Sequence, residues 1–125
     1  MKQKMTRRED YLKLIFTLSK KGEVHGADLA DELKIKRPTV CIYLKRLVEN
    51  GDITMDEHHC VHLTEQGYAV AQTTLHKHGM LFTLLQDLGV PTDVAAEDAC
   101  AIEHVISPET YGALKLLCQR RQISL

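Results

Sequence analysis

Residues 35–51, IKRPTVCIYLKRLVENG, decide the fold of the N-terminal half. Pro38 suits the first turn of a helix, because its missing backbone N–H needs no partner there. Gly51 follows as an ordinary helix stop signal. Between them runs an apolar stripe at helical spacing, formed by Val40, Leu44 and Leu47. The stretch therefore predicts a helix that buries one face and presents polar and basic side chains on the other.

Two shorter helices are expected before this one and a hairpin after it. Thr6-Arg7-Arg8-Glu9 has the form of a capping box, which opens a helix from about 7 to 20. Residues 25–35, HGADLADELKI, repeat apolar side chains along one face of a second short helix. Residues 52–63, DITMDEHHCVHL, place apolar residues on both sides of a polar tip at 56–59, which favours a two-stranded hairpin.

Three helices followed by a hairpin is the order of a winged helix-turn-helix, in which the third helix enters the major groove of DNA. The start of that helix would face base edges or phosphates, and its later basic residues would neutralise phosphates. The candidate DNA-contacting residues are Lys36, Arg37, Pro38, Thr39, Ile42, Tyr43, Lys45 and Arg46. A small helical bundle with a solvated third helix is the alternative.

The charge distribution agrees with a phosphate-binding N-terminal half. Residues 1–50 hold 12 Lys and Arg against 7 Asp and Glu, a net +5, whereas residues 51–125 hold 4 against 10, a net −6. A basic half can meet phosphates and an acidic half can hold cations.

Composition argues against a membrane or secreted protein. No apolar run approaches the roughly 20 residues that a membrane span needs. The N-terminus lacks the apolar segment of a signal peptide. The four cysteines form no CxxC pair. We therefore expect a cytoplasmic protein with free thiols rather than disulfides.

The second half reads as helices only. A long helical pattern opens at Thr64 and closes at Gly89, and another helix is expected at about 93–105. Ser107-Pro108-Glu109 has the form of an N-cap, a first-turn proline and a first-turn acid, which opens a last helix at about 108–120. The prediction is a mainly α protein with a winged-helix domain at residues 1–63 and a helical domain at residues 64–125.

The stretch DACAIEHVIS, residues 98–107, carries the chemistry of the second half. Cys100, Glu103 and His104 stand at i, i+3 and i+4, so a continuous helix would place three metal-binding side chains on one face. An ordinary half-buried helix face is the simpler interpretation. A thiol enzyme or a redox switch using Cys100 and His104 are further alternatives, although no oxyanion-forming loop or third orienting group accompanies them.

Five segments together resemble the diphtheria-toxin-repressor/MntR family of metal-dependent transcriptional regulators. They are RPTVCIYLKRLVENG, LTEQGYAVA, HKHGMLFTLLQDLGV, EDACAIEHVIS and PETYGAL, and they span about residues 8–116. The resemblance implies a non-enzymatic repressor of metal homeostasis genes, in the two-domain form without the SH3-like domain. It further implies a homodimer on a palindromic operator, with the metal as co-repressor.

The resemblance also nominates ligands outside that stretch. It adds Asp10 and His78 to Cys100, Glu103 and His104, whereas His76 would lie roughly 200° around the helix from His78. It places Ile42 at base edges, where an apolar side chain could contact only groups such as a thymine methyl.

Departures from the family pattern favour one divalent metal per chain. Lys13 stands where some relatives carry a second-site glutamate, and Phe82 and Ala96 replace ligands of an ancillary site. The Cys100 thiolate favours Fe²⁺, with Mn²⁺ next and Zn²⁺ or Co²⁺ able to bind in vitro. A regulator that has lost metal sensing, with Lys13 paired to Asp10, is the alternative.

A second set of metal-binding side chains lies in the expected wing. His58, His59, Cys60 and His62 form a short tract of a kind that can bind metal. His59 and Cys60 would point to opposite faces of a strand, and no second ligand pair at zinc spacing follows. A polar wing tip near phosphate is the simpler interpretation.

Overall fold

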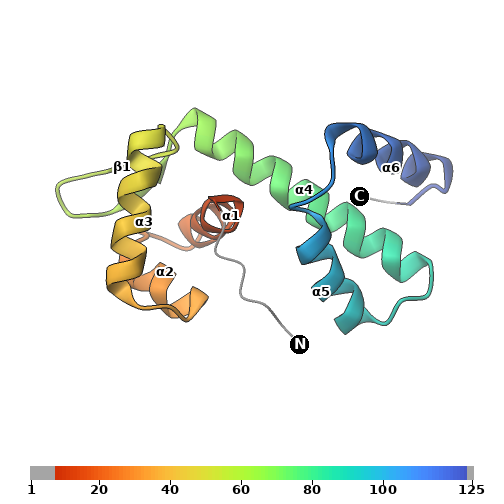
Figure 1. Cartoon of the computed structure of the whole chain (residues 1–125), viewed down its shortest axis with the longest axis horizontal. Helices are drawn as coiled ribbons and strands as arrows, with labels where there is room; N and C mark the ends of the chain where they lie inside the picture. Colours follow the sequence, from red (N-terminus) through yellow and green to blue (C-terminus); the bar gives the residue numbers. More distant parts are fainter. Residues whose placement is uncertain (1–7, 124–125) are drawn as a thin grey trace. The chain divides into compact units, whose positions relative to one another are not determined.

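The chain is helical apart from one short hairpin in the computed structural model, which describes residues 8–123 (Figure 1). The elements are α1 Arg8–Ser19, α2 Gly26–Leu33, α3 Arg37–Asn50, β1 Ile53–Met55, β2 Val61–Leu63, α4 Glu65–Asp87, α5 Thr92–Ile102 and α6 Pro108–Arg120. The predicted mainly α class is confirmed. The boundary between two compact units falls between Gln72 and Thr73, inside α4.

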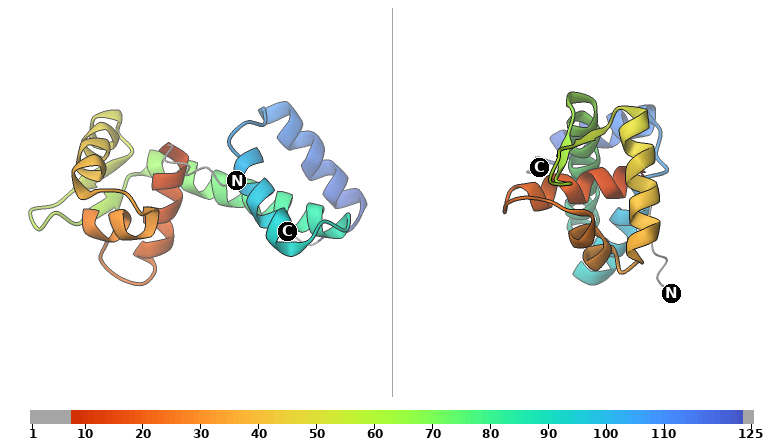
Figure 2. Two further views of the ribbon diagram at one scale, coloured as in Figure 1. Left: turned by 60° about the horizontal axis from the view of Figure 1, so that its bottom comes forward. Right: turned by 90° about the vertical axis from the view of Figure 1, so that its left-hand side faces the viewer.

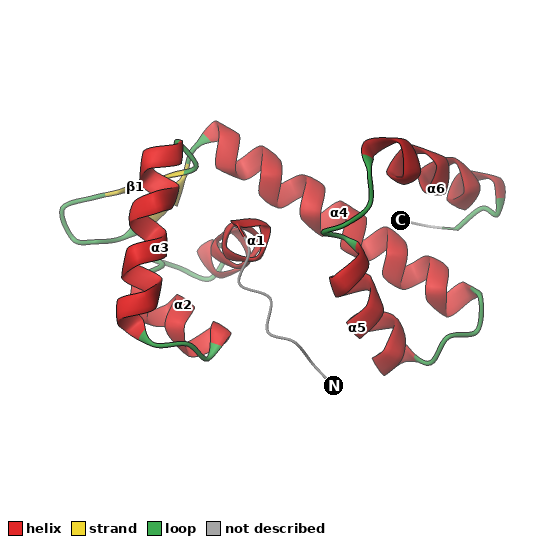
Figure 3. Ribbon diagram, in the orientation of Figure 1, coloured by secondary structure: helices red, strands yellow, loops and turns green. Residues whose placement is uncertain are grey.

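The first unit is a winged helix-turn-helix. Helices α1, α2 and α3 are followed by the antiparallel pair β1–β2, with Ile53 opposite Leu63 and Met55 opposite Val61 (Figure 3). Its core joins the predicted apolar faces of the three helices to the hairpin. The fully buried members include Tyr11, Leu12, Ile15, Val24, Leu29, Val40, Leu44, Leu47, Ile53 and Val61.

Helix α3 begins and ends where the sequence predicts. Lys36 is the extended residue before the helix, and Pro38 lies in the first turn. Gly51 adopts a left-handed φ of 87°, and its N–H donates to the carbonyls of Leu47 and Val48. A left-handed residue at this place costs glycine nothing, which explains the sharp exit of the chain towards β1.

Asp52 fixes that exit. The residue is 0% exposed. Its carboxylate accepts hydrogen bonds from Arg8 at 2.7 and 2.8 Å, from Asn50 at 2.9 Å and from Gln66 at 2.7 Å. The hydrogen bonds from Arg8 contribute most to lowering the pKa of Asp52 to about 2. The network joins the start of α1, the end of α3 and the start of α4.

The first turns of α4 pack against the backbone of Asp52, and at Gly67 there is no room for a side chain. A Cβ on Gly67 would stand 2.0 Å from the carbonyl oxygen of Asp52. That carbonyl also accepts the N–H of Thr64 at 3.0 Å, so moving it away from Gly67 would break this hydrogen bond.

Gly67→Ala is therefore expected to destabilise the protein by about 3 kcal/mol, because the added methyl must displace backbone. Gly79→Ala is the matched control on the same helix, since a Cβ there meets nothing within 4 Å. The control should stabilise the helix by roughly 0.5–1 kcal/mol, the usual gain of alanine over glycine. Urea unfolding followed by circular dichroism measures both changes, and equal effects would contradict the close approach.

The second unit packs α5 and α6 against the C-terminal half of α4 (Figure 2). Its buried core consists of Met80, Leu81, Leu84, Ala99 and Cys118. Ser107 caps α6 by accepting the N–H of Thr110 at 3.1 Å, as predicted. Ile102 of α5, Leu114 of α6 and Ile106 in the connection between them pack on this core, whereas Leu117 is 39% exposed.

One predicted helix boundary is wrong. Helix α5 ends at Ile102, not near 105, and Glu103, His104 and Val105 form a turn. The Glu103 N–H still donates to Ala99, but the His104 N–H donates to Ala101, three residues back. This tightening at a helix end is common. The predicted capping box at Thr6-Arg7 and the start of the first helix lie partly outside the described residues.

Candidate metal centre and nucleic-acid interface

Glu103 is the centre of a histidine–carboxylate cluster in the second unit. Its Oε1 lies 3.0 Å from His78 Nδ1 on α4, and its Oε2 lies 3.4 Å from His104 Nε2. The Glu103 side chain is 0% exposed. A buried carboxylate needs such partners, because removal from water disfavours its charged form.

The turn after α5 produces this geometry. On an extended α5, His104 would continue the helical face of Cys100. The tighter turn instead brings His104 beside one oxygen of Glu103, while His78 reaches the other oxygen from α4. Phe82, one turn along α4, stacks on the His78 ring with centroids 6.2 Å apart and so helps fix its orientation.

The other predicted ligands lie on two different helices. Cys100 is half-buried on α5, three residues before Glu103. Asp10 is buried in α1 of the first unit, at 7% exposure. His76 makes no part of the Glu103 cluster, since its Nδ1 contacts the hydroxyl of Tyr111 on α6.

The donor chemistry of the Glu103 cluster fits a divalent transition metal. Imidazole nitrogens and a carboxylate oxygen are ligands that Fe²⁺, Mn²⁺ and Zn²⁺ all accept. A carboxylate flanked by two imidazoles also offers mixed donors from separate elements. These residues would supply charge neutralisation and fixed ligand positions, and the ion would supply the bond that ties those elements together.

The predicted DNA-contacting residues mostly lie on an open face of α3. Seven of the eight are exposed: Lys36, Arg37, Pro38, Thr39, Ile42, Lys45 and Arg46. Ile42 is 59% exposed, so its side chain is accessible to a partner.

Tyr43 differs from the rest of that face. Its ring stacks on buried Tyr11 with centroids 4.3 Å apart and the planes only 5° apart. Burial is the main cause that raises the pKa of the Tyr43 hydroxyl. Tyr43 therefore packs α3 against α1, in addition to any contact that its half-exposed side chain makes with DNA.

The histidine–cysteine tract of the wing does not gather into one cluster. His62 contacts Asp56 at 3.0 Å, and exposed His58 lies beside Glu57. Cys60 faces away from the wing tip, towards His25 and Glu23 of the segment between α1 and α2. The sequence alone does not reveal His25 and Glu23 as neighbours of Cys60, because no local spacing connects His25 to a cysteine 35 residues later.

Comparison with domain families covers nearly all of the chain. Residues 4–58 match the iron dependent repressor N-terminal DNA binding domain, and residues 64–123 match the iron dependent repressor metal binding and dimerisation domain. The chain belongs to the iron-dependent repressor family. This family is the diphtheria-toxin-repressor/MntR group that the sequence resembles, and its members are transcriptional regulators.

Curated members of the iron-dependent repressor family are identical to this chain at about a third of the aligned positions. The transcriptional regulator MntR of Escherichia coli O6:H1 is 37% identical over 113 residues, which cover 90% of this chain and 73% of that protein. The diphtheria toxin repressor of Corynebacterium efficiens is 31% identical over 116 residues, covering 91% of this chain and 50% of that protein.

Solved structures of this family share the fold. The manganese regulator SloR superposes with a TM-score of 0.81 at 26% identity, covering 92% of this chain and 55% of that one. The IdeR of T. acidophilum gives 0.79 at 28% identity, covering 97% and 56%. The chain thus spans about half the length of these solved relatives. Within the described residues, no helix is both long and apolar enough to cross a membrane.

Proposed function

We propose that this protein is a cytoplasmic transcriptional repressor that binds operator DNA as a homodimer when loaded with Fe²⁺ or Mn²⁺. The observation that carries the proposal is the buried Glu103 carboxylate between His78 and His104, in a chain that also carries an open recognition helix. The solved manganese regulator SloR and the curated iron-dependent repressor IdeR of Mycobacterium bovis are both similar to this chain, which supports a metal co-repressor.

The proposed ligand set is Asp10, His78, Cys100, Glu103 and His104. The cluster geometry supports His78, Glu103 and His104. Asp10 rests on the family resemblance, and Cys100 rests on its spacing from Glu103 and His104. A metal held by donors from α1 and from the second unit would fix the angle between the two recognition helices of a dimer, as half-site spacing requires.

One ion per chain is proposed, with Fe²⁺ preferred. Lys13 lies one turn after Asp10, and an ammonium there opposes a second cation nearby. A thiolate ligand from Cys100 makes the site softer than an all-oxygen and imidazole site, and so shifts the preference away from Mn²⁺.

The proposal is tested by DNA binding with and without metal. The probe is a palindromic duplex, selected from random sequence by the metal-loaded protein and labelled for fluorescence anisotropy. Fe²⁺ under anaerobic conditions should tighten binding about 5–150-fold, the usual range for coupled sites, and Mn²⁺ should tighten it less. Equal affinity with and without either ion would show a regulator that does not sense metal.

Removal of a single phosphate contact provides a finer test of the recognition helix. Arg37→Ala should reduce the slope of log K against log salt by about one unit, because one fewer counterion is released. Arg120→Ala, which removes an exposed cation from α6, is the control and should leave the slope unchanged. Equal slopes for wild type and Arg37→Ala would remove Arg37 from the DNA interface.

A further inference from the structure

Three metal-binding side chains gather at the base of the wing, within the DNA-binding unit. Cys60 Sγ lies 3.4 Å from His25 Nε2. One donor atom each from Glu23, His25 and Cys60 lies within 4.8 Å of the other two. Glu23 and His25 belong to the segment between α1 and α2, and Cys60 immediately precedes β2.

Backbone contacts hold these two segments together. The N–H of Val61 donates to the carbonyl of Val24 at 2.8 Å, so the neighbours of all three donors are joined directly. Val24 and Val61 are both buried in the core of the unit. The donor positions are therefore set by the fold and not by mobile side chains alone.

The carboxylate of Asp28 lies beside His25. Asp28 Oδ2 accepts the His25 backbone N–H at 2.8 Å and lies 3.7 Å from the ring Nδ1. At 3.7 Å this carboxylate is too far to hydrogen-bond the ring, but its negative charge favours a cation beside His25. Nε2 is the atom that faces Cys60 here.

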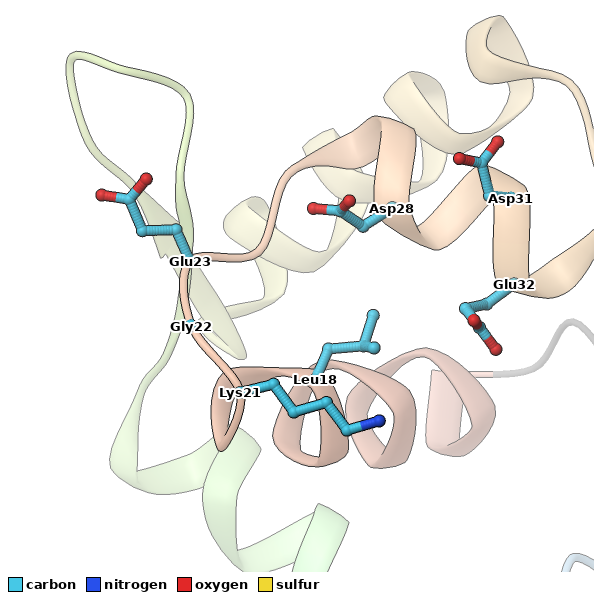
Figure 4. A pocket seen from close by; sticks show the side chains of 7 residues that line it. All are labelled: Leu18, Lys21, Gly22, Glu23, Asp28, Asp31 and Glu32. Carbon is cyan, nitrogen blue, oxygen red and sulfur yellow. The ribbon is translucent and has the colours of Figure 1, made fainter.

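The surroundings are acidic. Glu23 and Asp28 also line a hollow of about 350 Å³ between the end of α1 and α2, with Asp31, Glu32 and a single cation, Lys21 (Figure 4). Figure 4 shows Glu23 on the connecting segment beside the wing loop, with Asp28 and Asp31 along α2. Four carboxylates against one ammonium favour a cation at this edge of the unit.

We propose that Glu23, His25 and Cys60 bind a Zn²⁺ ion that clamps the wing to the segment between α1 and α2. A thiolate, an imidazole and a carboxylate are established zinc donors, and a water completes a tetrahedral site with three protein ligands. A thiolate donor disfavours Mg²⁺, Ca²⁺ and Mn²⁺. Glu23 is exposed, which leaves the water position open to solvent.

Binding requires loss of one proton. Burial, and then the charges of Asp56 and Glu23, raise the pKa of the Cys60 thiol. The thiol is therefore protonated without metal. As the Zn–S bond forms, the S–H bond breaks and the proton passes to solvent. The site is separate from the Glu103 cluster and does not depend on metal-controlled repression.

The experiment is a Co²⁺ titration of the full chain carrying Cys100→Ser, which removes the thiol near Glu103. Absorption from thiolate-to-cobalt charge transfer reports only Co²⁺–sulfur bonds. One such band is expected, and Zn²⁺ should abolish it by displacing Co²⁺. Adding Cys60→Ser should remove the band, whereas adding Cys41→Ser, at an exposed cysteine of α3, should leave it unchanged.

A second variant pair separates binding from folding. Asparagine in place of His25 still favours the helix N-cap, but its side chain is shorter and lacks the imidazole. His25→Asn should therefore lower the affinity for Co²⁺ at least tenfold. His58→Ala is the control, because its side chain is 79% exposed at the wing tip. Circular dichroism confirms that each variant folds. Absence of the band in the Cys100→Ser protein, its survival in Cys60→Ser, or equal losses in His25→Asn and His58→Ala would overturn the proposal.

Discussion

Replacing Glu103 by alanine is expected to remove the metal response of DNA binding, while metal-free binding stays as it is in the wild type. The Glu103 carboxylate contacts both His78 and His104, so its loss removes one donor and releases the two imidazoles from their fixed positions. A coupling of about 1–3 kcal/mol between metal and DNA would disappear, which is a 5–150-fold loss of affinity in the presence of metal. Fluorescence anisotropy titrations of the DNA with and without Fe²⁺ measure this change in affinity.

Asp98→Ala is the matched control for this prediction. It removes an exposed carboxylate from α5, five residues before Glu103. Its metal response should equal that of the wild type. Glu103→Gln, which keeps the shape of the side chain but not its charge, should behave as Glu103→Ala does. A full metal response in both Glu103 variants would exclude the cluster as the sensing site.

Replacing Asp52 by alanine should have the largest effect on stability. The change would leave the Arg8 guanidinium, Asn50 and Gln66 without their shared acceptor at a fully buried position. Removing one partner of a fully buried ion pair costs about 3–5 kcal/mol, and the lower end is expected here because the Arg8 side chain is 37% exposed. Asp87→Ala, which breaks the exposed pair between Asp87 and Arg121, should cost less than about 1 kcal/mol. Urea unfolding at neutral pH compares the two variants.

The same residue predicts how stability depends on pH. The folded-state pKa of Asp52 is about 2, below the unfolded value. Its stabilisation is therefore complete above roughly pH 5 and is lost as the pH falls towards 2, with a total on the order of 2 kcal/mol. Asp52→Asn should show a smaller loss over this range than the wild type. Parallel curves for the two proteins would show that Asp52 contributes nothing to acid denaturation.

Local sequence chemistry accounts for most of the fold. Pro38 and Gly51 delimit α3, and Ser107 with Pro108 opens α6, because each of these signals acts on its own neighbours. The end of α5 was not predictable in this way. The turn at Glu103 follows from packing on α4 and α6, where Ile102 and Ile106 join the core, and not from a stop residue.

In the candidate site, too, some residues are predictable from local sequence and others only from the folded structure. Cys100, Glu103 and His104 stand out by spacing, whereas His78 required the family resemblance. The contact of His78 on α4 with Glu103 in the turn after α5 joins residues 25 positions apart in the sequence. Cys60 stands among histidines in the sequence, yet its partner in the fold is His25, 35 residues earlier. Long-range pairs of this kind are fixed by tertiary packing, which leaves no periodic signal in one sequence.

The most direct measurement is the affinity of Fe²⁺ for the protein, determined anaerobically with and without saturating operator duplex. Coupled sites must affect each other equally. We predict that the duplex tightens Fe²⁺ by the same factor by which Fe²⁺ tightens the duplex, between about 5 and 150. The same Fe²⁺ affinity with and without DNA would contradict metal-controlled repression by this chain.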